Sequence, residues 1–134
     1  MANEIYPKWK EAIQQASANS SLAGTVKAVL IDTAAYTYST SHEFLSDIPL
    51  ADRIAISGAL TGKTYTGGLF DADNTVFTAV TGDVSEAIAI FVDTGTAATS
   101  RLVAFFDTGV TGLPVTPNGG DINITFNASG IFQL

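Results

Sequence analysis

The stretch from Asn74 to Thr108 constrains the fold most, because it holds three apolar runs with short polar breaks between them. The runs cover residues 74–80, 86–93 and 101–108, and the breaks are rich in Gly, Asp, Thr and Ser. In the second run, residues of different bulk alternate: Ile88, Ile90 and Val92 against Ala87, Ala89 and Phe91. Short apolar runs bounded by turn residues are typical of strands buried on one face or both. We therefore expect these three runs to be the central strands of the fold.

Residues 4–18 form the one segment with a clear helical pattern. Apolar residues recur there at intervals of three and four and define one face of a helix: Ile5, Trp9, Ala12, Ile13 and Ala16. Pro7 suits the first helical turn, where its missing N–H costs nothing. Two interpretations stay open. The helix either covers the end of a β core or forms an arm that docks on a neighbouring subunit through Tyr6 and Trp9, since aromatic residues anchor interfaces.

Shorter strand signals occur along the rest of the chain. They lie at residues 25–32, 53–57, 63–66, 121–126 and 131–134, and one helical turn with Ser41 as its N-cap is expected at 41–47. About eight short strands separated by turn residues predict a mainly β fold, an antiparallel, jelly-roll-like β-sandwich with one short N-terminal helix. We expect a single domain over residues 1–134, with residues 1–18 as the helix or arm.

The charge content points to an assembly. Only 14% of the residues are charged, against about 25% in typical soluble domains, so we expect a homo-oligomer or a component of a larger particle. The formal net charge of −7 and the scattered Lys and Arg residues argue against a nucleic-acid partner. The longest apolar runs fall far short of a membrane span, and the N-terminus does not resemble a secretory signal.

Two sequence motifs resemble catalytic or phosphate-binding signatures. Residues 57–64 end in Gly-Lys-Thr like a phosphate-binding loop, but the opening glycine is displaced and Gly67-Gly68 follows where a helix is required. We interpret this segment as a hairpin turn between strands. Asp-Thr-Gly occurs at Asp93 and again at Asp107, as in aspartic proteases. Both copies come directly after apolar runs, and we interpret them as turns that end strands.

Metal and cofactor signals are equally weak. Residues 71–82 lack the central Gly and the final Glu of a calcium loop. His42 is the only histidine and the chain has no cysteine, so we expect no catalytic, cofactor or metal site and no enzyme activity. A calcium ion among the acidic loops and a small hydrolase are the less favoured alternatives.

Several turns and strand edges carry a family resemblance. The segments that carry it are residues 42–48, 57–64, 70–74 and 113–121, together with 9–12 and 26–32. In these segments the chain resembles a group of small structural proteins of tailed bacteriophages, and the similarity covers most of its length. Proteins of this kind typically decorate and cement the capsid.

The resemblance implies a non-enzymatic protein on the outside of the virion, made in the cytoplasm of the bacterial host. Its partners would be the major capsid protein and copies of itself. The alternative is a tail- or fibre-associated adaptor or receptor-binding module. We expect the interface to include Tyr6, Trp9 and Ile13 of the helix and Tyr36 and Tyr38 of the following loop.

Overall fold

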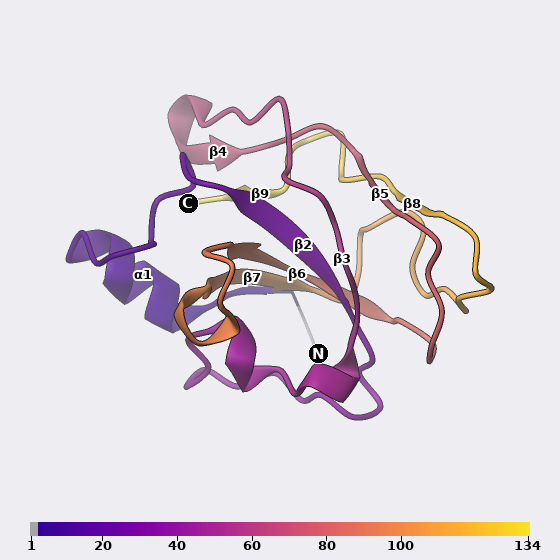
Figure 1. The fold of residues 1–134 in the computed structure, drawn as a ribbon. Coiled ribbons are helices and arrows are strands. Elements are labelled where there is room, and N and C mark those ends of the chain that lie inside the picture. The colour runs from indigo at the N-terminus through magenta and orange to yellow at the C-terminus, as the bar shows by residue number, and fades with distance from the viewer. Residues whose placement is uncertain (1–2) are drawn as a thin grey trace.

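The main sheet is antiparallel and has five strands in the order β1-β7-β6-β2-β3 (Figure 1). The structure is a computed structural model that describes residues 3–134. The strands of this sheet are β1 (Glu4–Ile5), β2 (Val26–Ile31), β3 (Arg53–Ile56), β6 (Ala87–Val92) and β7 (Arg101–Phe106). Among the described residues, no helix is long and apolar enough to cross a membrane.

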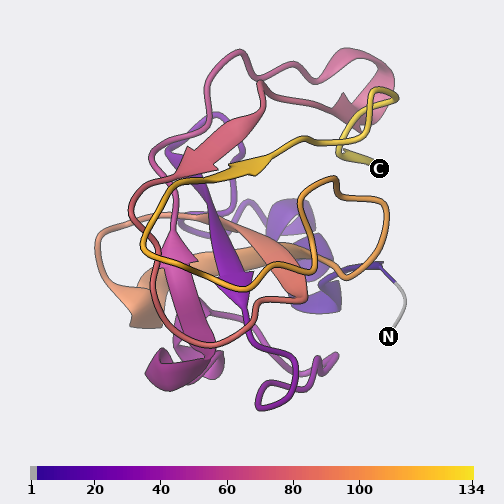
Figure 2. The same ribbon diagram turned by 90° about the vertical axis from the view of Figure 1, so that its right-hand side faces the viewer.

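Two short antiparallel ladders form a second layer. One pairs β4 (Leu69–Phe70) with β9 (Phe132–Gln133), and the other pairs β5 (Thr75–Phe77) with β8 (Ile122–Ile124). Short 3₁₀ turns occupy the connections at Leu45–Asp47, Leu50–Asp52, Thr66–Gly68 and Ala97–Thr99. In Figure 1, β4 and β9 lie above β6 and β7, while the segment with the first two 3₁₀ turns lies below them. Figure 2 shows the β5–β8 ladder crossing in front of β2.

The three inner strands are covered on both faces. Every residue of β6 is buried, and β2 and β7 each have only one residue that is partly exposed. Uninterrupted apolar sequence is what a strand needs when neither face meets water. Lys27, the partly exposed residue of β2, directs its ammonium group to Asp93 at 2.9 Å. The hydrogen bond from Lys27 lowers the pKa of the Asp93 carboxyl.

The N-terminal segment belongs to the core. Helix α1 (Pro7–Gln14) is shorter than the predicted 4–18, because Glu4 and Ile5 pair with Phe105 and Ala104 as β1. Trp9 is buried, and its indole N–H donates to the Ser20 carbonyl at 2.9 Å. Within this chain the segment closes the outer edge of β7, in line with the first of the two interpretations, in which the helix covers the end of a β core.

The predicted class is confirmed, with corrections to its details. The fold is mainly β and antiparallel, with one α-helix near the N-terminus and nine strands among residues 3–134. The strands form one large sheet and two small ladders instead of the two equal sheets of a jelly roll. The predicted pairing of residues 131–134 is confirmed in β9. Of the three runs expected at the centre, the first forms β5 in a small ladder, and β2 takes its place beside β6.

The turn at 41–47 also differs from its prediction. The 3₁₀ turn begins at Leu45, and the Asp47 carboxylate accepts the backbone N–H groups of Glu43 and Phe44 at 2.7 and 2.9 Å. Ser41 instead bonds to Ser39, so its hydroxyl does not cap the turn. A carboxylate satisfies two backbone donors at once, which a single serine hydroxyl does less effectively.

We expect Ile90→Ala to lower the free energy of unfolding by about 2–5 kcal/mol, because it removes a fully buried side chain from β6 and leaves a cavity. Ile56→Ala is the matched control, since the Ile56 side chain is 46% exposed on β3. Its cost should stay below about 1 kcal/mol. Urea unfolding followed by circular dichroism measures both values, and equal losses would contradict two-sided burial of the inner strands.

Candidate functional site: an apolar groove beside helix α1

A chain of aromatic rings leads from the core to the surface beside α1. The Trp9 ring meets Phe132 edge-on with centroids 5.7 Å apart, and Phe132 packs against Phe70 at 5.4 Å. Phe70 in turn contacts Tyr65 at 5.9 Å. The first three rings are buried, whereas Tyr65 is 46% exposed. The two ends of this chain, Trp9 and Tyr65, line a groove on the surface.

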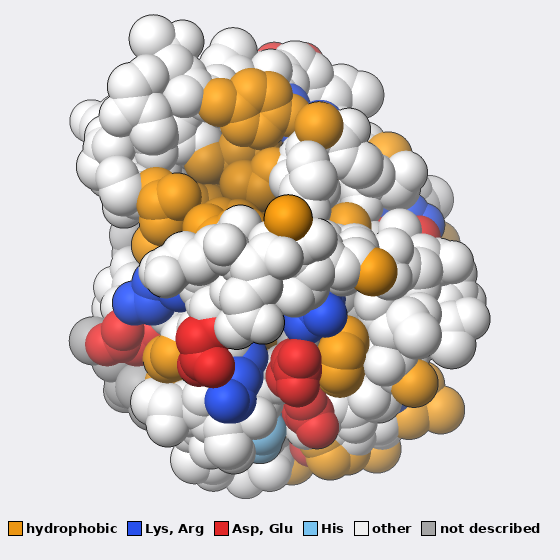
Figure 3. Space-filling view, turned by 90° about the vertical axis from the view of Figure 1, so that its left-hand side faces the viewer, with side chains coloured by type: hydrophobic (Ala, Val, Ile, Leu, Met, Phe, Trp, Pro, Cys, Tyr) orange, Lys and Arg blue, Asp and Glu red, His pale blue; other side chains and the backbone are white. Residues whose placement is uncertain are grey.

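The groove holds about 320 Å³ and is mostly apolar. We call it the α1 groove and define it by its large lining side chains: Trp9, Ile13, Leu22, Tyr65 and Leu134. Figure 3 shows apolar side chains gathered around a hollow in the upper part of this face. Exposed apolar surface gathered in one concave place, unlike scattered single residues, is typical of an interaction site.

Two side chains hold the groove wall in place. The Lys63 ammonium donates to the carbonyl of Leu22 at 2.8 Å and also to that of Gly24. The Tyr65 hydroxyl donates to the same Leu22 carbonyl at 3.0 Å. These bonds fix the 22–24 loop against the second layer, so this wall of the groove is preformed.

Charged side chains lie below the groove on the same face (Figure 3). Lys8 and Glu11 of α1 form an ion pair at 3.4 Å, and Arg101 pairs with Glu43 at 2.9 Å. The Arg101 guanidinium also donates to the Ala18 carbonyl and lies 5.0 Å from the centre of the Phe44 ring. We call these four charged residues the charged rim. An apolar centre beside a polar, solvated rim is the usual anatomy of a protein interface.

The predicted interface residues separate into two groups. Trp9 and Ile13 line the groove, where Ile13 is partly exposed but Trp9 is only 2% exposed. Tyr6 and Tyr36 are buried in the chain's own core, with 0% and 3% of their surface exposed. Exposed aromatic contacts at Tyr6 and Tyr36 are therefore ruled out in this fold. The reason is that Tyr6, the residue just before α1, packs against the 33–40 loop.

The buried tyrosines form a hydrogen-bonded cluster. The hydroxyls of Tyr6 and Tyr36 lie 2.9 Å apart, and the Tyr36 hydroxyl lies 2.7 Å from Nδ1 of His42. Tyr38 is partly exposed and packs on Tyr6 and Phe105 at centroid distances of 5.0 and 5.6 Å. Burial raises the pKa of Tyr36 to about 12 and raises the pKa of Tyr6 further still. Both hydroxyls therefore stay protonated above pH 10, where an exposed tyrosine loses its proton, and they serve as structural hydrogen-bonding groups.

The two Asp-Thr-Gly segments do not meet. Asp93 follows β6 and Asp107 follows β7, and these neighbouring strands run in opposite directions. The two aspartates therefore lie at opposite ends of the strand pair, which puts roughly 17 Å or more between them for six-residue strands. A shared proton requires direct contact between the carboxyl groups, so the geometry excludes an aspartic-protease dyad.

The segment that resembles a phosphate-binding loop, residues 57–64, also has a structural role. Ser57 accepts the Ala28 N–H and Leu60 donates to the Val26 carbonyl, so residues 57–60 run on along β2. The Lys63 ammonium is hydrogen-bonded to the 22–24 loop, as described above, and does not face a phosphate site. Within residues 3–134 no three His, Asp or Glu side chains are placed to share a metal ion.

The sequence reasoning missed Leu22, Tyr65 and Leu134 as groove residues. They come from three segments that meet only in the folded chain, so no local pattern joins them. The one available signal was Tyr65 itself, a large aromatic residue between two threonines in a polar stretch.

Comparison with known proteins adds no assignment, since neither a family model nor a curated protein matches the chain.

The tyrosine cluster makes the free energy of unfolding depend on pH in the alkaline range. Between the ordinary tyrosine pKa of 10.0 and about 12, the folded chain keeps the Tyr36 proton while the unfolded chain releases it. The free energy of unfolding should therefore be undiminished below about pH 10 and fall as the pH rises toward about 12. Urea unfolding across this range measures the decline. Tyr36→Phe should make the decline shallower, and equal slopes in both proteins would contradict the assignment.

Proposed function

We propose that this protein is a non-enzymatic structural component of a tailed-phage virion that decorates and stabilises the capsid by binding the major capsid protein. The observation that carries the proposal is the α1 groove with the charged rim beside it. The resemblance of the turns and strand edges to small phage structural proteins supports the same role.

The groove suits recognition of an apolar protein segment. Its polar groups at the 22–24 loop are already satisfied by Lys63 and Tyr65, so a partner that covers them leaves few unpaired donors or acceptors. Burial of apolar surface contributes roughly 25 cal/mol per Å², less the cost of ordering. Tyr65 and Leu134, at 46% and 58% exposure, have the most surface to bury.

The charge of the chain fits the outside of a capsid. With a net charge of −7, the protein would be repelled by packaged DNA inside the capsid, and no such repulsion acts on the outer surface. The low density of charge also suits close packing between copies of the chain. We therefore place it on the capsid exterior, in contact with the major capsid protein and with further copies of itself.

The first test is the stoichiometry of purified virions from the source that encodes the chain. A capsid decoration protein should occur in fixed proportion to the major capsid protein when both are quantified by mass spectrometry. A few copies per particle would indicate the tail or fibre instead. Complete absence from the virions would refute the structural role.

The second test uses capsids stripped of the protein. We expect Tyr65→Ala to weaken rebinding at least tenfold, which is about 1.4 kcal/mol or more, because it removes an aromatic anchor from the groove. Val76→Ala is the matched control, since Val76 is also 46% exposed but lies on β5 outside the groove. Co-sedimentation measures both affinities after circular dichroism has verified the folds. Equal affinity of Tyr65→Ala and wild type would show that binding does not use the groove.

A further inference from the structure

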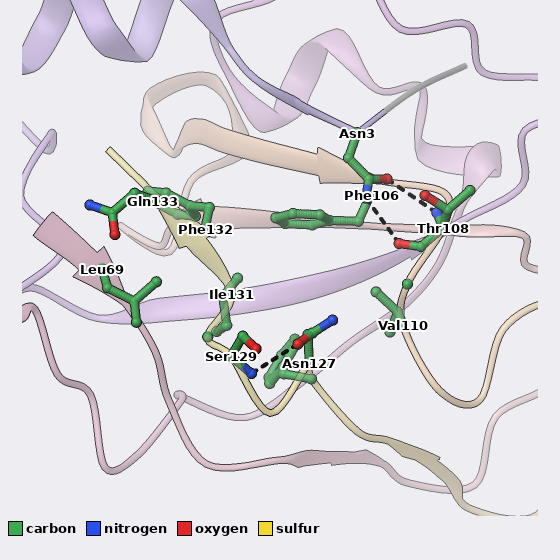
Figure 4. A pocket seen from close by; sticks show the side chains of 13 residues that line it. Asn3, Leu69, Phe106, Thr108, Val110, Asn127, Ser129, Ile131, Phe132 and Gln133 are labelled. Carbon is green, nitrogen blue, oxygen red and sulfur yellow. Dashed lines mark hydrogen bonds between the residues drawn. The ribbon is translucent and has the colours of Figure 1, made fainter.

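A second concave site opens on the side of the molecule where β7 ends. It is a cleft of about 350 Å³ between the end of β7 and the 126–133 segment of the second layer. Figure 4 shows Phe106 and Thr108 on one side of it and Asn127, Ser129 and Ile131 on the other. Its volume lies in the range of sites for small molecules.

The cleft is uncharged. None of the side chains that line it, all of them within the described residues, is Asp, Glu, Lys, Arg or His. An ionised ligand that enters such a site loses hydration and gains no opposite charge in return. This argues against phosphates, nucleotides and carboxylates as ligands and favours a neutral one.

One wall of the cleft is held rigid by an asparagine. The side-chain oxygen of Asn3 (Oδ1) accepts the backbone N–H groups of Asp107 and Thr108 at 2.8 and 3.1 Å, and its side-chain amide donates to the Thr108 backbone carbonyl at 3.0 Å. The dashed lines between Asn3 and Thr108 in Figure 4 mark the two bonds that join these residues. The backbone just after β7 is thereby held in place without help from a ligand.

The opposite wall carries both hydrogen-bond donors and hydrogen-bond acceptors. The side-chain oxygen of Asn127 (Oδ1) accepts the backbone N–H of Ser129 at 2.8 Å, which leaves the side-chain amide of Asn127 as a donor to the cleft. The hydroxyls of Ser129 and Thr108 can each donate and accept. A purely apolar ligand would cover these groups without pairing them, at a cost of about 1–3 kcal/mol for each.

Apolar surface fills the space between the two walls. Phe106 extends its ring across the cleft in Figure 4, with Val110 and Ile131 beside it. A ligand that fits must therefore have an apolar face as well as hydroxyl groups at its edges, and it must carry no charge. A neutral sugar ring has this combination, with C–H groups on its faces and hydroxyls that donate and accept around its rim.

We propose that the cleft binds one or two rings of a neutral saccharide. The Asn127 amide and the Thr108 and Ser129 hydroxyls hydrogen-bond the sugar hydroxyls, and the ring packs on Phe106. This site is separate from the α1 groove, and the proposal does not depend on the capsid role.

The experiment titrates the isotopically labelled full-length protein with neutral and charged sugars and follows backbone amide resonances by NMR. Maltose and lactose serve as free sugars, dextran as a neutral polysaccharide, and glucose 6-phosphate as the charged comparison. We expect the neutral probes to shift resonances around residues 106–110 and 127–132 at millimolar concentrations, the range of weak recognition. Glucose 6-phosphate should bind at least tenfold more weakly. Shifts with maltose or lactose indicate a site for free sugar, and shifts with dextran alone indicate a site for a polymer such as a cell-surface glycan.

Two variants test the location of the site. Ser129→Trp and Val110→Trp fill the cleft from opposite walls, and each should weaken sugar binding at least tenfold. Ser129 is exposed, so its replacement should leave the fold intact even if the partly buried Val110 does not tolerate tryptophan. Thr116→Trp is the control, because Thr116 is exposed and lies outside the cleft. The proposal is overturned if no neutral probe shifts these resonances, if glucose 6-phosphate binds equally well, or if Ser129→Trp binds like wild type.

Discussion

The structure depends on the pairing of β2, β6 and β7 with both faces buried. A strand that is covered on both sides needs two separate covering layers, and a chain of 134 residues has few elements with which to supply them. The second layer therefore consists of two-stranded ladders on one side, and the segment with the 3₁₀ turns at Leu45–Asp47 and Leu50–Asp52 lies on the other. The small ladders are too short to be stable alone, so the side chains of the main sheet hold them in place.

The need to cover the inner strands also explains why the N-terminal segment lies along the outer edge of β7. An unpaired edge next to buried strands would expose backbone donors and acceptors to other chains. Here β1 pairs with one part of that edge, and Leu45 donates to the Ser100 carbonyl on another part. The segment that looked like a docking arm is thus needed by the sheet itself. Its partly exposed face, at Ile13, remains available to line the groove.

The inner strands could be predicted from sequence because two-sided burial leaves a long apolar run at 86–93 and another at 101–108. The strand that pairs with each run could not be predicted from the sequence. The run at 74–80 looks equally apolar, yet Val76 is exposed and Phe77 is buried, because β5 covers the sheet instead of joining it. Periodicity likewise gave the apolar face of α1 but not what covers it, which is why Tyr6 was expected at an interface. The α1 groove and the cleft could not be predicted from the sequence, since the walls of each are formed by segments far apart in the chain.

Strand β9 borders both concave sites, since Leu134 directly after it lines the α1 groove while Ile131 and Phe132 line the cleft. It is only two residues long, and the backbone bonds beside it join Ile131 to Phe70 and Leu134 to Gly68. The position of this strand therefore depends largely on the Phe132 ring, which is packed between Trp9 and Phe70. Elements with so few backbone bonds open locally at a lower free energy than the core. The part of each site that β9 and its flanking residues contribute consequently depends on the packing of one aromatic ring.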